Sequence, residues 1–242
     1  SSDLPVSCVG RILTPENAEM LIENGYCDYV GLGRSLLCDP DFVKKLEEGK
    51  PETIRQCMMC NKGCTDAIQN RQFLSCVLNA ENGYEYQRVI TPAENKKKVV
   101  VVGGGPAGLE AARVARLKGH EVTLFEKETA LGGQLNIASV PPRKSEMTRA
   151  IHYLSEEAVR LGVHLKLGHQ ACAQCIAQEQ PDAVIIAVGA HNAIPPIEGH
   201  DLPHVYDAWK VLNHEQLPGG RVVVIGGGLV GAETAELLAT RG

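Results

Sequence analysis

The sequence has no long apolar run and few aromatic residues, which make up 4% of its 242 positions. No stretch of eighteen consecutive apolar residues occurs, so no membrane-spanning helix is predicted. The first residues lack a basic region followed by an apolar stretch, so no secretory signal peptide is predicted. A net charge of −5 lacks the positive excess that bulk electrostatic binding of nucleic acid needs. We therefore expect a cytoplasmic protein that binds neither membranes nor nucleic acid.

Cysteine and glycine, by contrast, are abundant, with nine and 25 residues. An apolar content of 44% and a charged content of 22% are ordinary for a globular protein, and the length allows two domains. Nine cysteines without a secretory signal indicate a reducing compartment. In such a compartment, clustered thiols are expected to bind metal instead of forming disulfides.

Four cysteines lie close together in the sequence: Cys57, Cys60, Cys64 and, after eleven intervening residues, Cys76. Three of them fall within eight residues, so one tight loop can direct their sulfurs at a common point. Gly63 fits a sharply turning loop whose backbone N–H groups point at charged sulfurs. The unequal spacing favours an iron–sulfur cluster over structural zinc, which prefers paired Cys-x-x-Cys units. Zinc and four metal-free reduced cysteines remain as alternatives.

The first fifty residues alternate between strand and helix signals. Apolar runs at residues 5–10 and 29–32 predict two strands, and helices are predicted to begin after Thr14 and after Asp39. The first helix is expected to bury Ala18, Leu21 and Ile22. This rhythm is typical of a parallel α/β fold.

Both predicted strands are followed by glycine and arginine, as Gly10-Arg11 and Gly33-Arg34. Such a pair lets backbone N–H groups approach a phosphate while the guanidinium binds it through two hydrogen bonds. In (β/α)₈ barrels, the loops after strands seven and eight often form a phosphate site. A single pair would be interpreted as a surface arginine beside a turn glycine. Two pairs in corresponding positions favour a phosphate site.

Four consecutive valines at 99–102 predict a strand that is buried on both faces. The turn that follows reads Gly103-Gly104-Gly105-Pro106-Ala107-Gly108 and opens a helix. Its three key glycines allow, in order, the tight turn, the approach of a pyrophosphate and the packing of the helix on the strand. The N-terminus of the helix favours binding of the pyrophosphate anion. Glu126 ends the next predicted strand, eighteen residues past Gly108, where a carboxylate would accept from ribose hydroxyls. This pattern predicts a dinucleotide site.

A second glycine turn, Gly132-Gly133-Gln134, follows soon after the acidic residue. An FAD-binding domain needs such a turn because its flavin half extends past the second strand. The predicted strand 183–188 ends in Gly189, where the backbone can again approach a cofactor. Together these features favour FAD as the first dinucleotide.

Cys172 and Cys175 lie in a helix-like stretch without a neighbouring proline or aromatic residue. A structural role is therefore favoured over redox chemistry for this pair. Further on, Val222–Ile225 predicts another strand, and the glycine pattern recurs at 226–231, 123 residues after the first. Two such patterns indicate two dinucleotides, one fixed and one exchanging. The residue that selects NAD or NADP would follow Gly242.

The order of these motifs resembles the 2,4-dienoyl-CoA reductase, 2-enoate reductase and trimethylamine dehydrogenase family, in which an old-yellow-enzyme barrel is fused to a disulfide-reductase-like module. The resemblance covers essentially the whole sequence, and the cysteine spacing is its most specific motif. It implies an α/β fold and an internal fragment of a longer protein. The implied parts are the C-terminal end of a TIM barrel (1–50), a cluster loop and linker (51–97), a Rossmann-like FAD domain (98–190), and a crossover with the start of a Rossmann-like NAD(P) domain (191–242).

The resemblance also implies a role for each motif. The FMN phosphate would be held by Arg11, Gly33 and Arg34, and a [4Fe-4S] cluster by Cys57, Cys60, Cys64 and Cys76. The FAD residues would be Gly103, Gly105, Pro106, Ala107, Gly108, Glu126, Lys127, Gly133, Gln134 and Gly189. NAD(P)H would be bound by Gly226, Gly228 and Gly231. Electrons would pass from NAD(P)H through FAD, the cluster and FMN to an activated C=C bond of a small-molecule substrate.

The sequence leaves several points open. No catalytic proton donor is identified within these residues, and neither the substrate nor the oligomeric state follows from them. Relatives often carry Asn-Pro after the fourth cysteine where this chain has Asn79-Ala80, a difference that concerns loop stiffness and not ligation. Two other readings are an amine-dehydrogenase type of enzyme whose fused module binds ADP structurally, and a zinc-stabilised flavoprotein.

Overall fold

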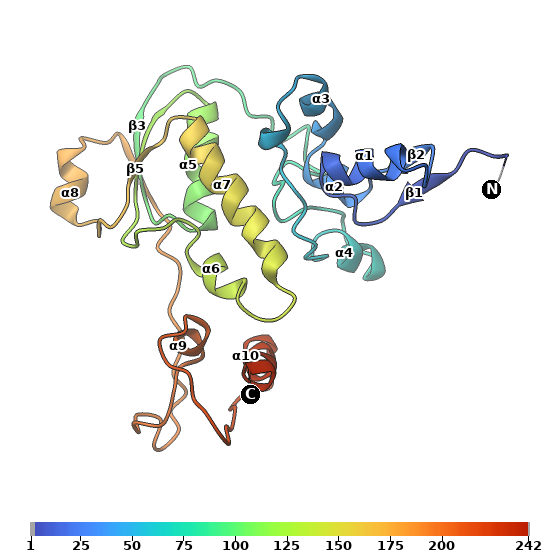
Figure 1. Cartoon of the computed structure of the whole chain (residues 1–242). Helices are drawn as coiled ribbons and strands as arrows, with labels where there is room; N and C mark the ends of the chain where they lie inside the picture. Colours follow the sequence, from blue (N-terminus) through green and yellow to red (C-terminus); the bar gives the residue numbers. More distant parts are fainter. Residues whose placement is uncertain (1–2, 242) are drawn as a thin grey trace.

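The computed structural model describes residues 3–241, so the predicted domain limits at residues 1 and 242 lie outside the described part (Figure 1). A small two-stranded sheet with short helices forms the N-terminal part, and a larger sheet with two long helices forms the middle. No helix within residues 3–241 combines the length and the apolar character needed to cross a bilayer.

The N-terminal sheet consists of β1 (Ser7–Val9) and β2 (Tyr29–Gly31), which pair in parallel. Helix α1 (Pro15–Glu23) connects them, as the sequence predicts. The Thr14 side chain accepts a hydrogen bond from the Asn17 N–H at 3.3 Å and so caps the helix. The unit is one strand–helix–strand repeat of a parallel fold.

The expected burial of α1 is wrong. Ala18 and Leu21 are only half-buried, and Ile22 is 42% exposed. The physical reason is the width of the sheet, because two short strands offer too little surface to cover one face of a nine-residue helix. The apolar residues of α1 therefore follow a helical spacing, but they do not pack into a core.

Four short helices follow β2 and surround the cysteine loop. Their bounds are α2 (Arg34–Cys38), α3 (Phe42–Glu47), the 3₁₀ helix η1 (Pro51–Thr53) and α4 (Thr65–Gln69). Helix α2 was not predicted, since five residues are too few to show a helical period. Helix α3 was predicted to be capped by Asp39, but its N-cap residue is Asp41.

The central sheet has the order β5-β4-β3-β6, and all its strands are parallel. The strands are β3 (Lys98–Val102), β4 (Glu121–Phe125), β5 (His164–Lys166) and β6 (Ala183–Ile186). Val101 of β3 lies opposite Leu124 on one side and Ile185 on the other. Val99, Val100 and Val101 are buried, which confirms the prediction of a strand covered on both faces.

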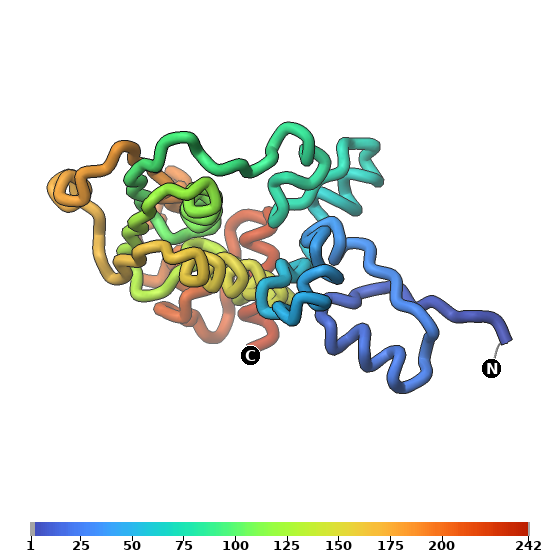
Figure 2. The backbone as a smooth tube through the Cα atoms, turned by 90° about the horizontal axis from the view of Figure 1, so that it is seen from above, coloured from blue at the N-terminus to red at the C-terminus, as the bar shows by residue number. Residues whose placement is uncertain are grey.

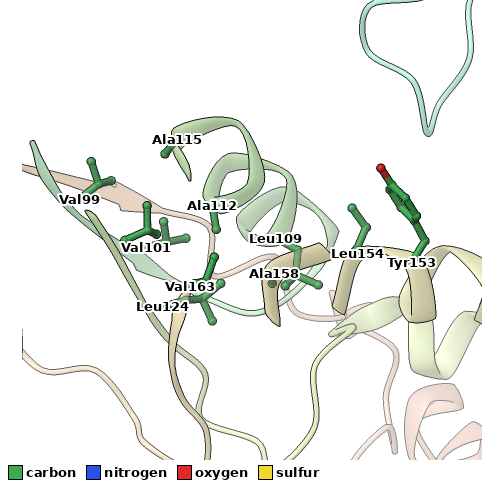
Figure 3. Packing of buried hydrophobic residues seen from close by; sticks show 11 residues of the cluster. Val99, Val101, Leu109, Ala112, Ala115, Leu124, Tyr153, Leu154, Ala158 and Val163 are labelled. Atoms are coloured by element: carbon green, nitrogen blue, oxygen red, sulfur yellow. The ribbon is translucent and has the colours of Figure 1, made fainter. Parts of the chain in front are cut away.

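The core of this domain lies between the sheet and two helices, α5 (Pro106–Leu117) and α7 (Thr148–Arg160). Figure 3 shows Leu109 and Ala112 of α5 beside Leu154 and Ala158 of α7, next to the strand residues. The remaining helices are α6 (Gln134–Ala138), η2 (Ser145–Met147) and α8 (Ala173–Gln178). This packing fixes the C-terminal ends of β3, β4 and β6, where the predicted nucleotide turns lie.

The predicted strand Val222–Ile225 does not form, and Val223 is 81% exposed. A strand needs a hydrogen-bonding neighbour, and no strand within residues 3–241 pairs with this segment. The helix after it does form, as α10 (Leu229–Arg241), and it lies beside α9 (Ala208–Leu212). Lys144, which lies between α6 and α7, pairs with Glu233 of α10 at 2.6 Å, and Figure 1 shows α10 below that loop.

Candidate functional site

All four cysteines predicted to bind metal line one small cavity of about 20 Å³. The other lining residues are Arg34, Leu37, Cys38, Met58, Asn61, Gly63, Ser75, Val77 and Leu78. Burial raises the pKa of the Cys57 and Cys60 thiols above the usual range, and the charge of Cys76 adds to both shifts. A cavity that disfavours several neighbouring thiolates suits a bound cation that compensates their charge.

Backbone N–H groups of the loop point at the sulfurs. The Met59 N–H donates to Cys57 Sγ at 3.4 Å, and the Lys62 backbone N–H lowers the pKa of the Cys60 thiol. These bonds are the kind that stabilise cysteine ligands of an iron–sulfur cluster. The donor set therefore fits the predicted [4Fe-4S] group.

The sulfurs do not converge on one point. Within residues 3–241, no three Cys, His, Asp or Glu side chains are grouped so that they could share one metal ion. Structural zinc needs four ligands within about 2.0–2.3 Å of a single ion. In a cubane cluster each cysteine binds its own iron, so the sulfurs stand further apart around a larger group. The four cysteines thus share a cavity, and their binding of a [4Fe-4S] cluster stays a prediction.

The loop turns sharply at residues other than the predicted one. Met59 and Asn61 have left-handed backbone angles, with φ of 59° and 61°, whereas Gly63 does not. Gly63 is required for a close approach instead, because a Cβ there would lie 2.6 Å from Ser75 O. The Ser75 N–H donates to Gly63 O at 2.7 Å, which brings Cys76 beside the other three cysteines.

A fifth cysteine, Cys38, lines the same cavity. It is the last residue of α2, and its side chain is completely buried. Its thiol interacts with that of Cys76, and this interaction lowers the pKa of Cys76 to about 6 and raises that of Cys38. Cys38 was missed because it lies nineteen residues before Cys57, outside any ligand spacing. Only the path of α2 brings it to the cavity.

The two glycine–arginine turns leave the same edge of the N-terminal sheet, because β1 and β2 are parallel neighbours. The Ser35 hydroxyl donates to Ile12 O at 2.6 Å and ties the turns together. Gly33 is the N-cap residue of α2. The predicted phosphate-binding turns thus lie side by side, and their role in FMN binding stays a prediction.

The two arginine side chains have further contacts. The Arg34 guanidinium donates to Asn61 Oδ1 at 2.6 Å and lines the cysteine cavity. Arg11 pairs with Glu146 Oε1 of the central domain at 2.6 Å, although its side chain is 64% exposed. Arg34 therefore links the predicted phosphate turn to the cysteine loop, a connection that the sequence does not reveal.

Asp39 organises the entry to the cysteine loop. Its buried carboxylate accepts from Lys45 Nζ at 2.6 Å and from the Arg55 N–H at 2.7 Å. The Arg55 guanidinium in turn donates to Leu78 O at 2.9 Å, two residues after Cys76. Asp39 thus fixes the backbone of Arg55 before the cysteine loop, and the Arg55 guanidinium holds the segment after Cys76.

We expect Asp39→Asn to lower the free energy of unfolding by about 1–3 kcal/mol. The amide keeps the shape of the carboxylate but loses the negative charge that pairs with Lys45. Its NH₂ group would also face a group that itself donates a hydrogen bond. Chemical denaturation of the purified protein measures the change. Asp41→Asn is the matched control, since Asp41 is exposed and its side chain makes no capping bond. Equal midpoints for the two variants would contradict the role given to Asp39.

The first glycine turn has the geometry of a nucleotide site. Gly103 has φ of 109°, and a Cβ there would lie 2.3 Å from Ala187 O of the neighbouring strand end. A Cβ on Gly108 would lie 1.9 Å from Gly103 O, so helix α5 can approach the turn only with glycine. Pro106 is the first residue of α5, whose unpaired N–H groups face the turn.

Glu126 and Lys127, which follow strand β4, differ in their surroundings. Glu126 is buried, and its carboxylate accepts from the N–H groups of Gly104 at 2.6 Å and Glu128 at 2.9 Å. Lys127 is exposed and pairs with Glu128 at 3.6 Å. Glu126 is thus held directly beside the glycine turn, as a ribose ligand would need to be.

The predicted flavin half of the site converges on the same turn. A Cβ on Gly133 would lie 2.9 Å from Gly105 Cα, so the two glycine turns touch. The Gln134 side chain donates to Ala190 O at 3.0 Å, next to Gly189, which has φ of 74°. Three segments that are distant in sequence therefore meet at the C-terminal ends of β3, β4 and β6.

The second glycine pattern repeats the first turn closely. Gly226 has φ of 108°, and a Cβ on Gly231 would lie 1.9 Å from Gly226 O, the same distance as in the first turn. Gly228 has open space around it. The turn therefore forms from its glycines alone, even though the strand before it is absent.

The fold and these turns define a dinucleotide-binding oxidoreductase module joined to the end of a flavin barrel. Residues 97–242 match the family model of pyridine nucleotide-disulphide oxidoreductases, and residues 1–53 match that of the NADH:flavin oxidoreductase / NADH oxidase family. The chain belongs to the 2,4-dienoyl-CoA reductase-like family, in which both parts occur together. The predicted family and fold class are confirmed, and flavin and pyridine nucleotide cofactors are those of the two matching families.

Individual relatives agree with this assignment. A bilirubin reductase of Mediterraneibacter gnavus is 76% identical over 239 residues, which are 99% of this chain and 37% of that protein. A cinnamate reductase of Clostridium sporogenes is 39% identical over 99% of this chain and 36% of its own length. The structure of a 2-naphthoyl-CoA reductase complex superposes with a TM-score of 0.95 at 35% identity, covering 99% of this chain and 36% of that one. The chain thus spans little more than a third of these relatives.

Proposed function

We propose that the protein containing this chain is an NAD(P)H-dependent flavin oxidoreductase that reduces an activated C=C bond. The observation that carries this proposal is the cavity lined by four cysteines and by Arg34 of the second glycine–arginine turn. Bound FAD, [4Fe-4S] and FMN would carry the electrons from the nicotinamide to the substrate. Arg34 belongs to the predicted FMN phosphate turn and is hydrogen-bonded to Asn61 of the cysteine loop. The cavity therefore lies next to that turn.

The residues of the chain would bind and orient these groups. The N–H groups at the start of α5 would bind the FAD pyrophosphate, and the buried Glu126 carboxylate would accept from the ribose. Gln134, fixed by Ala190 O, would position the flavin half of the cofactor. Gly226 to Gly231 would bind the pyrophosphate of NAD(P)H in the same way.

The relatives suggest where to search for the substrate. Their names refer to bilirubin, cinnamate and 2-naphthoyl-CoA, all of which are conjugated unsaturated compounds. We propose that this protein also acts on a conjugated C=C bond. Bilirubin is the first compound to test because the bilirubin reductase is 76% identical to this chain.

The test is the anaerobic reduction of the intact protein by NADH and by NADPH, followed by visible absorbance and by analysis of iron and flavins. We expect bound FAD, FMN and iron, bleaching by one of the two nucleotides, and reoxidation by bilirubin or cinnamate. Bleaching by neither nucleotide, with ADP extracted in place of FAD, would support the amine-dehydrogenase type instead. Zinc without iron would support the zinc-stabilised flavoprotein.

We expect Cys38→Ala to lower the reduction potential of the cluster. The change removes the thiol that interacts with Cys76 Sγ, and a donor directed at a ligand sulfur favours the more negatively charged reduced state of a cluster. A hydrogen bond is worth about 0.5–1.5 kcal/mol, which for one electron corresponds to roughly 20–60 mV. Redox titration followed by electron paramagnetic resonance measures the shift. Cys38→Ser keeps a donor and should recover most of it, and an unchanged potential in Cys38→Ala would contradict this interaction.

A further inference from the structure

The pair Cys172 and Cys175 is not part of the cofactor sites, and in the structure it forms a disulfide. The expectation that the cysteines bind metal instead of forming disulfides is therefore wrong for this pair. The two Cα atoms are 5.1 Å apart, within the usual range of about 4.4–6.8 Å. It is the one disulfide within residues 3–241, and the other seven cysteines are free. The start of α8 brings the two sulfurs together without any help from distant segments.

The pair lies on the surface and far from the cysteine cavity. Cys172 is exposed and Cys175 is half-buried. Figures 1 and 2 both place α8 at the end of the central sheet that faces away from the N-terminal helices. A reagent in solution can therefore reach Cys172 directly.

The two sulfurs are not equivalent. Cys172 is the N-cap residue of α8, and its Sγ accepts a hydrogen bond from the Cys175 N–H at 3.1 Å. That bond would stabilise a thiolate on Cys172 after reduction. Cys172 therefore combines exposure with a stabilised anion, as an exchanging cysteine requires, and Cys175 is placed to resolve a mixed disulfide.

The surroundings of α8 do not depend on the disulfide. Glu179, just after the helix, pairs with Lys166 of β5 and accepts from the Thr123 hydroxyl of β4 at 3.3 Å. On the other side, the His169 N–H donates to Glu126 O at 2.9 Å. Both ends of the segment are thus tied to the sheet by bonds that remain when the disulfide opens. Reduction would be local and reversible.

We propose that Cys172 and Cys175 form a thiol–disulfide exchange site for dithiols in solution, a function beyond the proposed reductase activity. A thiolate of the external dithiol attacks Cys172 Sγ, the S–S bond breaks, and Cys175 leaves as a thiolate and takes up a proton. The second thiolate of the dithiol then attacks the dithiol sulfur that is bonded to Cys172. A disulfide forms within the dithiol, and Cys172 leaves as a thiolate and takes up a proton. Two electrons and two protons pass from the dithiol, which becomes a disulfide, to the pair.

The first test uses the folded holoenzyme and dithiothreitol as the probe. The protein is equilibrated anaerobically at a series of reduced-to-oxidised dithiothreitol ratios, alkylated, digested and mapped by mass spectrometry. We expect the peptide with Cys172 and Cys175 to change completely from disulfide to doubly alkylated across the series. A pair that is alkylated at every ratio, or that stays closed in excess reduced dithiothreitol until the protein is denatured, would overturn the proposal.

The second test separates the roles of the two cysteines. Mixed-disulfide formation with 5,5′-dithiobis(2-nitrobenzoate) is compared in Cys175→Ser, which retains Cys172, and in Cys172→Ser, which retains Cys175. We expect Cys172 to react at least about tenfold faster, because it is exposed and its thiolate is stabilised. Equal rates would show that Cys172 is not the exchanging cysteine. Retained flavin in both variants confirms that each is folded.

Discussion

Cys76→Ser is expected to remove the iron from the intact protein. Cys76 is the remote cysteine of the predicted set, and the backbone contact between Ser75 and Gly63 helps to bring it to the cavity. A serine hydroxyl is a poor ligand for iron in a sulfur site, because soft thiolates select Fe–S clusters. Since changes outside the first ligand shell already cost about 10–100-fold in metal affinity, we expect iron and acid-labile sulfide to fall by more than about tenfold. Elemental analysis and visible absorbance of anaerobically purified protein measure both.

The control for this variant is Cys8→Ser. Cys8 is also partly buried and free, but its sulfur faces Tyr26 O and does not line the cavity. Its substitution should leave iron, sulfide and flavin unchanged. Retention of full iron content in Cys76→Ser would show that the four cysteines do not act as one ligand set. Retained FAD with lost iron would show that the central domain remains folded.

The glycine turns and the cysteine loop were predicted because their information is local. A glycine is needed wherever a Cβ would meet a backbone oxygen a few residues away, as at Gly108 beside Gly103 O, and such a requirement leaves a short sequence pattern. The spacing of Cys57, Cys60 and Cys64 is local in the same sense. The structure gives the glycine turns the close contacts that their pattern implies, and the four cysteines line one cavity.

The missed residues depend on contacts across long sequence separations. Cys38 reaches Cys76, Arg34 reaches Asn61, and Asp39 reaches Arg55, but no spacing rule connects the members of these pairs. The cavity wall is therefore less predictable than its ligands. Its composition follows from the path of α2, a helix too short to leave a periodic signal.

The second glycine pattern shows what a local signal does not determine. The turn from Gly226 to Gly231 repeats the geometry of the first turn, but the apolar run before it has no strand partner within residues 3–241. A turn forms from the conformational freedom of its glycines, whereas a strand needs hydrogen bonds from a neighbour. An apolar β-branched run predicts a strand only where the fold supplies that neighbour.

Gly108→Ala is expected to destabilise the central domain and to abolish FAD binding. The new Cβ would lie 1.9 Å from Gly103 O and 3.3 Å from Val101 Cγ1, and these atoms belong to the backbone of the turn and to the buried strand β3. Neither can move without separating α5 from the sheet. Overpacking of a core commonly costs about 1–3 kcal/mol, and contact with a fixed backbone oxygen places this variant at or above the upper end. Thermal unfolding and the flavin content of the purified protein measure the effect.

Two further variants identify the cause of this effect. Gly219→Ala adds the same methyl group where nothing lies within 4 Å, so its stability should stay within about 0.5 kcal/mol of the original. Gly231→Ala places a Cβ 1.9 Å from Gly226 O, but in a turn whose preceding segment is exposed. We expect it to keep FAD and to slow reduction of the flavin by NAD(P)H. If Gly108→Ala retained FAD and full stability, the close contact between α5 and the first glycine turn could not exist as described, and the assignment of this turn as the FAD site would fail with it.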